Sequence, residues 1–177
     1  IGPTGYGESP YQSASTFAGN PLLIDLETLV SEGLLDSLSP DAPKDTDRVD
    51  FEAVTAYKEK ELFRAFKTSV DQLSDEIDAF AEKNPWAEEY ALFAAIKESF
   101  DFVKWTDWGD RGLRTRAPGA LKAFREAHAE RVRYHLFLQY LFDKQWFALK
   151  AYANQKGVSL FGDMPIYLAE DSADTWT

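Results

Sequence analysis

The sequence predicts an α/β fold in which helices lead into short buried strands, and three observations predict it. Val158, Leu160 and Phe161 form a short apolar run of the kind that is buried on both faces of a parallel sheet. A stretch with helical spacing, from about 118 to 155, leads into this run. Gly162 and Asp163 follow it, at the carboxyl end of the predicted strand. Since active-site side chains of (β/α) barrels stand at the C-terminal ends of the strands, we expect a barrel segment here.

Residues 1–36 are predicted to form a second barrel segment with a substrate loop. Ile1 would end a strand, and the loop GPTGYGESPYQ that follows contains three glycines and two prolines. Glycine permits close backbone approach and proline fixes φ, so this composition favours a defined loop path. Tyr6 and Tyr11 then offer aromatic faces to a pocket wall. A brief helix with Asp25 as its cap completes the segment and ends near Gly33.

Residues 37–117 are predicted to be a mostly helical insertion. Residues 37–50 are polar, with two prolines, and favour a solvated loop. Apolar residues then recur every three to four positions in successive helices, the last of which starts at Pro85. The stretch WTDWGDRGLRTRAPG is predicted to be a loop whose tryptophans and arginines either pack or bind.

Residues 118–177 are predicted to form a barrel helix and the strand after it. The helical stretch exceeds the ordinary length of about 8 to 20 residues, which predicts a bend or two helices in series. The apolar residues of this stretch, among them Trp146, Leu149 and Tyr152, occur at helical spacing, and so does Trp86 in the insertion. We therefore assign Trp86, Trp146 and the phenylalanines of the stretch to the core and not to sugar platforms.

Composition excludes several classes of partner. Thirty acidic residues against 19 basic ones give a formal net charge of -11, which disfavours binding to nucleic acid or to an anionic membrane surface. No run of about 18 apolar residues predicts a membrane helix. The chain has no cysteine, which fits a cytoplasmic protein. Its 13 Phe, 8 Tyr and 5 Trp suit a filled core or surfaces that stack on sugar rings.

The sequence predicts neither a metal site nor a cofactor site. His128 and His135 lie two helical turns apart, and no further ligand completes a set with them. The acidic clusters at 45–50 and 170–174 lack the ligand and glycine spacing of a calcium loop, so we interpret both as solvated charge.

Four long blocks of the sequence resemble one enzyme family. They are GPTGYGESPYQSASTFAGNPLLIDLE, WAEEYALFAAIKE, FLQYLFDKQWFALKAYANQKG and GDMPIYLAEDSADTW. In this order they resemble the 4-α-glucanotransferases, also called amylomaltases or disproportionating enzymes, of glycoside hydrolase family 77. The resemblance implies a (β/α)8 TIM barrel that acts on α-1,4-glucan or maltooligosaccharide without a cofactor. It also implies that this chain is an internal fragment, from the end of strand 2 to strand 3.

The resemblance implies substrate-binding roles for four residues. Asp163 matches an aspartate beside the sugar at the cleavage point, and Tyr11 matches a tyrosine that stacks beneath that sugar. Ser9 lies beside Tyr11 in the loop, and Tyr6 matches an aromatic position that contacts glucan farther away. The aspartate nucleophile and glutamate acid/base of this retaining family come from later strands, so we expect no catalytic residue within this fragment and no activity from it alone.

Two other functions fit the residues without the resemblance. One is a non-catalytic glucan-binding module, which the tyrosines and tryptophans favour. The other is a helical interaction protein whose acidic surface keeps it in solution. The resemblance favours the transferase, located in the cytoplasm, or in the plastid if the source is a plant.

Overall fold

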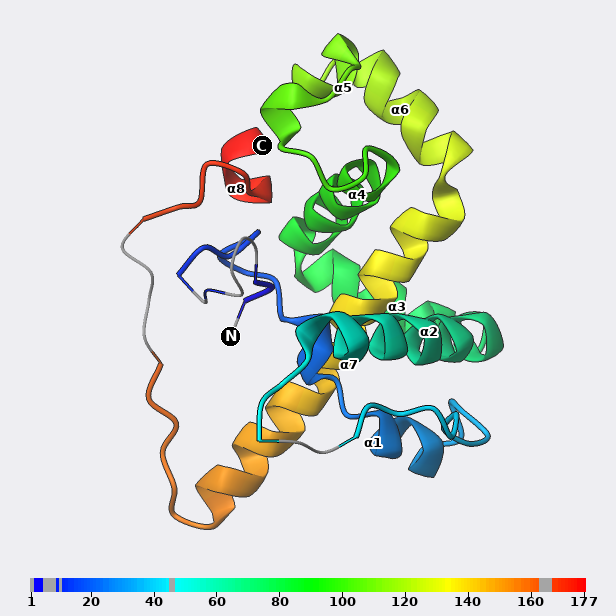
Figure 1. Cartoon of the computed structure of the whole chain (residues 1–177), viewed down its shortest axis with the longest axis vertical. Helices are drawn as coiled ribbons and strands as arrows, with labels where there is room; N and C mark the ends of the chain where they lie inside the picture. Colours follow the sequence, from blue (N-terminus) through cyan, green and yellow to red (C-terminus); the bar gives the residue numbers. More distant parts are fainter. Residues whose placement is uncertain (1, 5–8, 10, 45–46, 163–166) are drawn as a thin grey trace.

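The chain folds into helices arranged around one long helix, as Figure 1 shows. The computed structural model describes residues 2–4, 9, 11–44, 47–162 and 167–177. The elements are η2 (Pro21–Leu23), α1 (Leu26–Ser31), α2 (Phe51–Ser69), α3 (Ser74–Lys83), α4 (Pro85–Ser99), η3 (Trp105–Asp107), α5 (Arg111–Arg114), α6 (Pro118–Ala127), α7 (Ala129–Gln155) and α8 (Ala173–Trp176). No helix within the described ranges combines the length and apolar character needed to cross a bilayer.

Local chemistry explains where several of these helices begin and end. The side chains of Asp25, Asp50 and Asp110 each accept a hydrogen bond from a backbone N–H in the first turn of α1, α2 and α5. Proline occupies the first turn of α4 and α6, where its missing N–H costs nothing. Gly33, with φ of +73°, follows α1 in the left-handed region that glycine adopts without strain. The predicted cap at Asp25 is thus confirmed.

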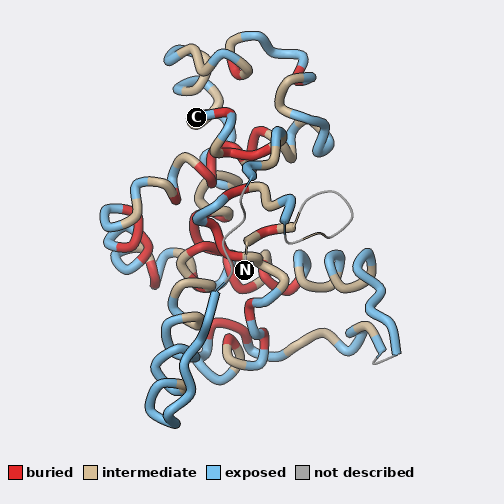
Figure 2. Tube along the Cα trace, turned by 90° about the vertical axis from the view of Figure 1, so that its left-hand side faces the viewer, coloured by how far each residue is buried: buried red, intermediate tan, exposed pale blue. Residues whose placement is uncertain are grey.

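Two hydrophobic clusters form the core, which Figure 2 shows as the buried part of the trace. The first lies between α1, α2, α3 and α7, and Leu62, Phe66 and Phe137 are among its members. The second joins α4 to α8 through Trp108 and Trp176, whose rings lie 5.7 Å apart. Both clusters draw residues from distant parts of the sequence. The predicted division of the chain into segments 1–36, 37–117 and 118–177 stays a prediction.

Side-chain amides of α7 fix the segment that precedes α1. Gln139 accepts a hydrogen bond from the Gly19 N–H (2.8 Å) and donates one to the Gly19 carbonyl (3.1 Å). Gln145 repeats this pattern with the backbone of Asp25, at 2.7 and 3.0 Å. Each glutamine thus pairs both backbone polar groups of one residue.

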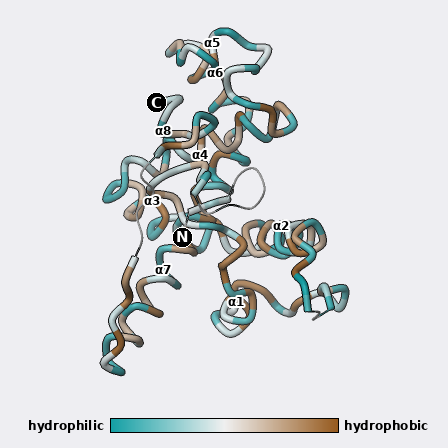
Figure 3. The backbone as a smooth tube through the Cα atoms, turned by 60° about the vertical axis from the view of Figure 1, so that its left-hand side comes forward, coloured by the Kyte–Doolittle hydropathy of each residue, from teal (hydrophilic) through white to brown (hydrophobic). Residues whose placement is uncertain are grey.

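The strand predicted at Val158, Leu160 and Phe161 is wrong for this structure. These residues have no regular secondary structure and are exposed, and Phe161 is completely so. Figure 3 shows hydrophobic residues along this segment where it leaves α7, in the region that Figure 2 shows as exposed. A strand requires a neighbour that accepts its backbone hydrogen bonds, and the pairing present in the described residues is a single bridge between Thr4 and Ser13. The predicted α/β fold class is therefore not seen in the described part of the chain, which is mostly helical.

The long helical stretch is two helices in series, as predicted. α6 ends at Ala127 and α7 begins at Ala129, with His128 between them. The assignment of its phenylalanines to the core is correct for Phe137 and wrong for Phe147, which is exposed. Leu149 and Tyr152 are exposed as well. Figure 1 shows the reason, because the second half of α7 extends beyond the other helices.

The tryptophan-rich stretch is more ordered than a loop. It contains η3 and the one-turn helix α5, and its tryptophans pack against other residues. Trp108 is buried and stacks on Phe100 at 5.8 Å, while the Trp105 indole N–H donates to the Glu170 carbonyl at 2.9 Å. Trp86 is partly buried against the core, as predicted.

Candidate functional site

A cavity of about 1530 Å³ lies between segments from both ends of the chain and the central helices. Its lining includes residues of the opening loop, the first half of α2, the second half of α4, the first part of α7 and residues 167–171. The volume exceeds the roughly 300–1,000 Å³ of an ordinary small-molecule site, so an extended ligand fits it better than a single small molecule. Tyr11 and Ser9 both line this cavity. Tyr6 and Asp163 lie outside the described residues.

The opening loop is closed at its base, which fixes the place of Tyr11. Thr4 and Ser13 form an antiparallel bridge, and the Ala14 N–H donates to the Pro3 carbonyl at 3.0 Å. Gly2 permits this closure, because a Cβ at its position would lie 2.2 Å from the Ser13 Oγ.

Tyr11 stands in the described tip of this loop. The Gln12 N–H donates to the Ser9 carbonyl at 3.1 Å, which turns the chain at this point. The Tyr11 side chain is 65% exposed on the cavity side of the loop. A tyrosine ring on the cavity side of the loop suits contact with a ligand that has flat apolar faces.

The α7 side of the cavity carries an ion-pair network centred on Arg131. Its guanidinium donates to Glu98 of α4 at 2.5 and 3.0 Å and to Glu59 of α2 at 3.0 Å. The Tyr134 hydroxyl donates to the second Glu59 oxygen at 2.8 Å, and His135 Nε2 lies 3.1 Å from Glu98. The network thereby joins three helices below the cavity.

Hydrogen bonding decides the charge state of this network. Burial alone would raise the pKa of the Glu98 carboxyl, but the hydrogen bonds with His135 and Arg131 outweigh it and hold that pKa below its ordinary value. Burial and the nearby Glu59 carboxylate raise the pKa of Tyr134, so its hydroxyl stays protonated and donates. A general acid needs a raised carboxyl pKa, whereas Glu98 has the opposite shift. We therefore interpret Glu59 and Glu98 as structural carboxylates.

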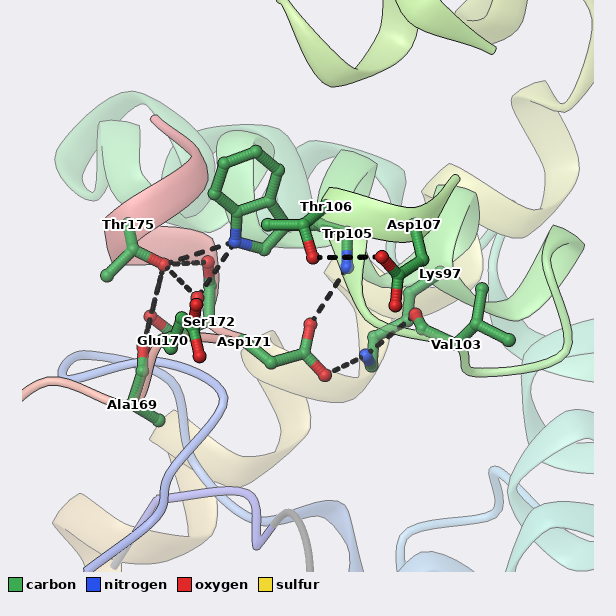
Figure 4. Close-up of polar contacts among 10 residues, drawn as sticks. All are labelled: Lys97, Val103, Trp105, Thr106, Asp107, Ala169, Glu170, Asp171, Ser172 and Thr175. Atoms are coloured by element: carbon green, nitrogen blue, oxygen red, sulfur yellow. Dashed lines mark hydrogen bonds and ion pairs between the residues drawn. The ribbon is translucent and has the colours of Figure 1, made fainter. Parts of the chain in front are cut away.

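A second polar network, missed from the sequence, anchors residues 169–175 beside the cavity (Figure 4). The Lys97 ammonium contacts Asp171 at 2.5 Å and donates to the Val103 carbonyl at 3.1 Å. The other Asp171 oxygen accepts from the Trp105 N–H at 3.1 Å, and Thr175 Oγ1 donates to the Glu170 carbonyl at 2.7 Å. Lys97 and Asp171 are 74 positions apart, and no local spacing reveals their pairing.

The acidic cluster at 170–174 therefore differs from the solvated charge we predicted. Asp171 is bound as above, and the Asp174 carboxylate accepts from the Thr16 N–H at 2.6 Å and from the Thr16 hydroxyl at 2.7 Å. Both aspartates connect the end of the described chain to earlier segments. The signal that could have found them is their place within the block GDMPIYLAEDSADTW.

The two histidines are not brought together. His128 stacks on Phe124 with ring centroids 4.2 Å apart, whereas His135 contacts Glu98 at the cavity. Within the ranges that the structure describes, no three His, Cys, Asp or Glu side chains stand where they could hold one metal ion.

Known proteins resemble this chain along its whole length. A family model described as 4-alpha-glucanotransferase matches residues 1–177. The 4-alpha-glucanotransferase of Thermus thermophilus is 46% identical over 181 residues, covering 99% of this chain and 36% of the relative. That of Streptococcus pneumoniae is 43% identical over 182 residues, with the same coverage. A chloroplastic/amyloplastic 4-alpha-glucanotransferase of Solanum tuberosum is 36% identical over 174 residues, covering 95% of this chain and 30% of the relative.

The fold also matches a solved structure. An amylomaltase from Streptococcus agalactiae in complex with acarbose superposes on the whole chain with a TM-score of 0.95 and 36% sequence identity. The match covers 37% of that amylomaltase, so this chain spans about a third of the length of the proteins it resembles. With the family model, the relatives and the fold in agreement, the chain belongs to the 4-alpha-glucanotransferase family.

Proposed function

We propose that the full-length gene product containing residues 1–177 transfers segments of α-1,4-glucan between maltooligosaccharides or starch chains. The observation that carries the proposal is the family match over every residue of the chain. The cavity supports it, because its size and its exposed tyrosine suit an extended sugar ligand. The amylomaltase of matching fold was solved with acarbose.

The chemistry of a retaining transfer favours a substrate-binding role, and not a bond-breaking one, for this part of the protein. A retaining transfer needs a carboxylate nucleophile and a carboxylic acid/base about 5 to 5.5 Å apart. The carboxylates of Glu59 and Glu98 are both bound to Arg131, and the lowered pKa of Glu98 opposes proton donation. We place the nucleophile and the acid/base outside residues 1–177, and the proposed reaction uses no metal or cofactor.

The proposed contacts with the sugar come from the opening loop and from the segment after Phe161. Tyr11 stacks beneath the sugar at the cleavage point, with Ser9 beside it in the loop. Asp163 helps to order the same sugar, and Tyr6 contacts the glucan farther along. The support for Tyr11 and Ser9 is their place in the cavity lining. For Asp163 and Tyr6 it is their place in blocks that resemble the family.

The proposed architecture places this chain within a larger barrel. Residues 1–36 and 118–177 would contribute the stretch from the end of strand 2 to strand 3 of a (β/α)8 barrel, with 37–117 as its helical insertion. The exposed apolar segment at 158–161 supports this, because it has the composition of a strand that lacks neighbours here. We place the protein in the cytoplasm, or in the plastid of a plant source, as for the Solanum tuberosum relative.

The test measures glucose and longer oligomers that the full-length gene product forms from maltotriose. We expect the wild type to be active and Tyr11→Ala to lower kcat/KM by about 10- to 1000-fold, or about 1.4 to 4 kcal/mol. Stacking under the reacting ring matters most in the oxocarbenium-like transition state, so the loss should appear in kcat.

Tyr11→Phe is the matched control, because it keeps the ring and removes only the hydroxyl. It should retain most of the activity, and circular dichroism should show all variants folded. Near-native kcat for Tyr11→Ala would remove Tyr11 from the site. A wild type that binds maltooligosaccharides but forms no products would support a glucan-binding module instead.

A further inference from the structure

Phe102, in the turn that follows α4, has an unusual backbone and an unusual exposure. Its φ is +60°, and that of Asp101 is +52°. Both values lie in the left-handed region, which side chains with a Cβ adopt at a cost and aromatic residues rarely adopt. The Phe102 side chain is nevertheless 68% exposed, so core packing does not explain the strained backbone.

The turn is held in place from its other side. The Phe102 N–H donates to the Lys97 carbonyl at 2.9 Å, and the Val103 N–H donates to the Phe100 carbonyl at 3.2 Å. The Lys97 ammonium donates to the Val103 carbonyl and pairs with Asp171 (Figure 4). These bonds fix the backbone on both sides of Phe102 while its ring stays in solvent.

The same ring lines the cavity that Tyr11 lines. Tyr11 comes from the opening loop and Phe102 from the end of α4, so one continuous cavity receives exposed aromatic rings from two separate segments. Polar side chains, among them Gln12 and Lys104, line it as well. Flat apolar faces with hydrogen-bonding groups between them are what a chain of linked sugar rings requires.

We propose that Phe102 is a further sugar platform, besides Tyr11 and Tyr6, which stacks on a ring of the α-1,4-glucan away from the cleavage point. The inference rests on the proposed function and deepens it, because it makes Phe102 a determinant of chain-length preference. We expect that a short maltooligosaccharide held at Tyr11 does not reach Phe102 and that a long one does. The left-handed turn is maintained because it presents the ring to the glucan.

The experiment compares maltotriose with maltoheptaose as substrates of the full-length gene product. Phe102→Ala and Phe102→Gly both remove the ring, and we expect each to raise KM for maltoheptaose by about 3- to 10-fold. Their kcat, and their KM for maltotriose, should stay within about twofold of wild type. Phe102→Trp keeps a platform and should retain the preference for maltoheptaose.

Two controls separate binding from structure. Val103→Ala changes the exposed neighbour, which is not part of the described cavity lining, and should leave both KM values unchanged. Phe102→Gly should melt at a higher temperature than Phe102→Ala, because glycine accepts the left-handed backbone.

Three outcomes are decisive. A selective rise of the maltoheptaose KM in both ring-removing variants supports the platform. If KM is unchanged for both substrates and both variants melt well below wild type, the ring packs against another part of the full-length protein and the inference is wrong. A wild type inactive on both substrates overturns the proposed function itself, which distinguishes that failure from loss of the platform alone.

Discussion

Gln139 shows how one side chain fixes the path of a segment 120 positions away in the sequence. It is 1% exposed, and its amide bonds both the N–H and the carbonyl of the buried Gly19. A buried peptide group without a partner costs about 1–3 kcal/mol. The loop that carries Tyr11 precedes this anchor directly, so the place of the site depends on it.

Replacement of Gln139 by leucine should be strongly destabilising. Gln139→Leu leaves two buried polar groups of Gly19 unpaired, and we expect a loss of about 2 to 4 kcal/mol in the free energy of unfolding. Gln145→Leu is the matched control, because Gln145 makes the same pair of bonds with Asp25, an exposed residue that water can solvate. That change should cost about 1 kcal/mol or less. Denaturant unfolding of both variants measures the difference, and equal losses would contradict it.

Among the elements, the contact between α2, α4 and α7 depends on charge as well as on packing. Arg131 of α7 bonds Glu98 of α4 and Glu59 of α2, and its guanidinium lies 5.2 Å from the Phe63 ring centre. Burial would raise the pKa of the Glu98 carboxyl. In the folded state, the hydrogen bonds with His135 and Arg131 nevertheless hold this pKa below its ordinary value. Folding and the protonation of Glu98 are therefore linked.

This linkage predicts a loss of stability in acid. Since the folded pKa of Glu98 lies below the unfolded value of about 4.3, its contribution is complete above that pH. The contribution disappears as the pH falls through the lower, folded pKa. Melting temperatures from pH 7 to pH 3 should show Glu98→Gln well below wild type at pH 7 and close to it at pH 3.

The control for the acid experiment is Glu82→Gln. Glu82 is an exposed glutamate of α3, and its replacement should shift the melting temperature little at any pH. A gap between wild type and Glu98→Gln that stays constant over the whole pH range would show that packing, and not ionisation, explains the contribution of Glu98.

At the scale of the whole molecule, the second core cluster depends on a residue from the last helix. Trp176 packs against Phe93 and Trp108, each at 5.7 Å between ring centres, and the Arg116 guanidinium lies 4.3 Å from its ring centre. Its indole N–H donates to the Leu113 carbonyl at 3.0 Å. α8 thus completes the packing of α4 and α5.

Trp176→Ala should therefore remove a large part of this cluster. Truncation of a buried tryptophan costs about 3–5 kcal/mol. Trp176→Phe keeps a ring and loses mainly the bond to Leu113, so we expect about 1 to 2 kcal/mol from it. Denaturant unfolding measures both changes. A loss below 1 kcal/mol for Trp176→Ala would show that α8 is not part of the core.

The sequence predicts the helices of this fold better than its long-range contacts. Spacing and caps locate α1 to α4, and the excessive length of the helical stretch predicts a bend or a break, which the structure places at His128. These signals are local. The strand at 158–161 was predicted from local composition, although a strand exists only through a partner that composition does not supply.

For the site, the sequence could identify residue types but not their neighbours. The dense aromatic loop points to Tyr11, which the structure places at the cavity. The pairing of Lys97 with Asp171 and the exposure of Phe102 depend on the turn after α4, and neither Lys97 nor Phe102 carries a motif. Only the folded chain brings these groups together.

The hydrogen bonds between Asp174 and Thr16 also determine when the opening loop can reach its final position during synthesis. The two residues are 158 positions apart, so at the ribosome all the residues between them must emerge before the carboxylate can reach the Thr16 N–H. Helices such as α2 and α4 need only local contacts and can form while translation continues. The loop that bears Tyr11 is made before these helices, yet its attachment to Asp174 is completed after them.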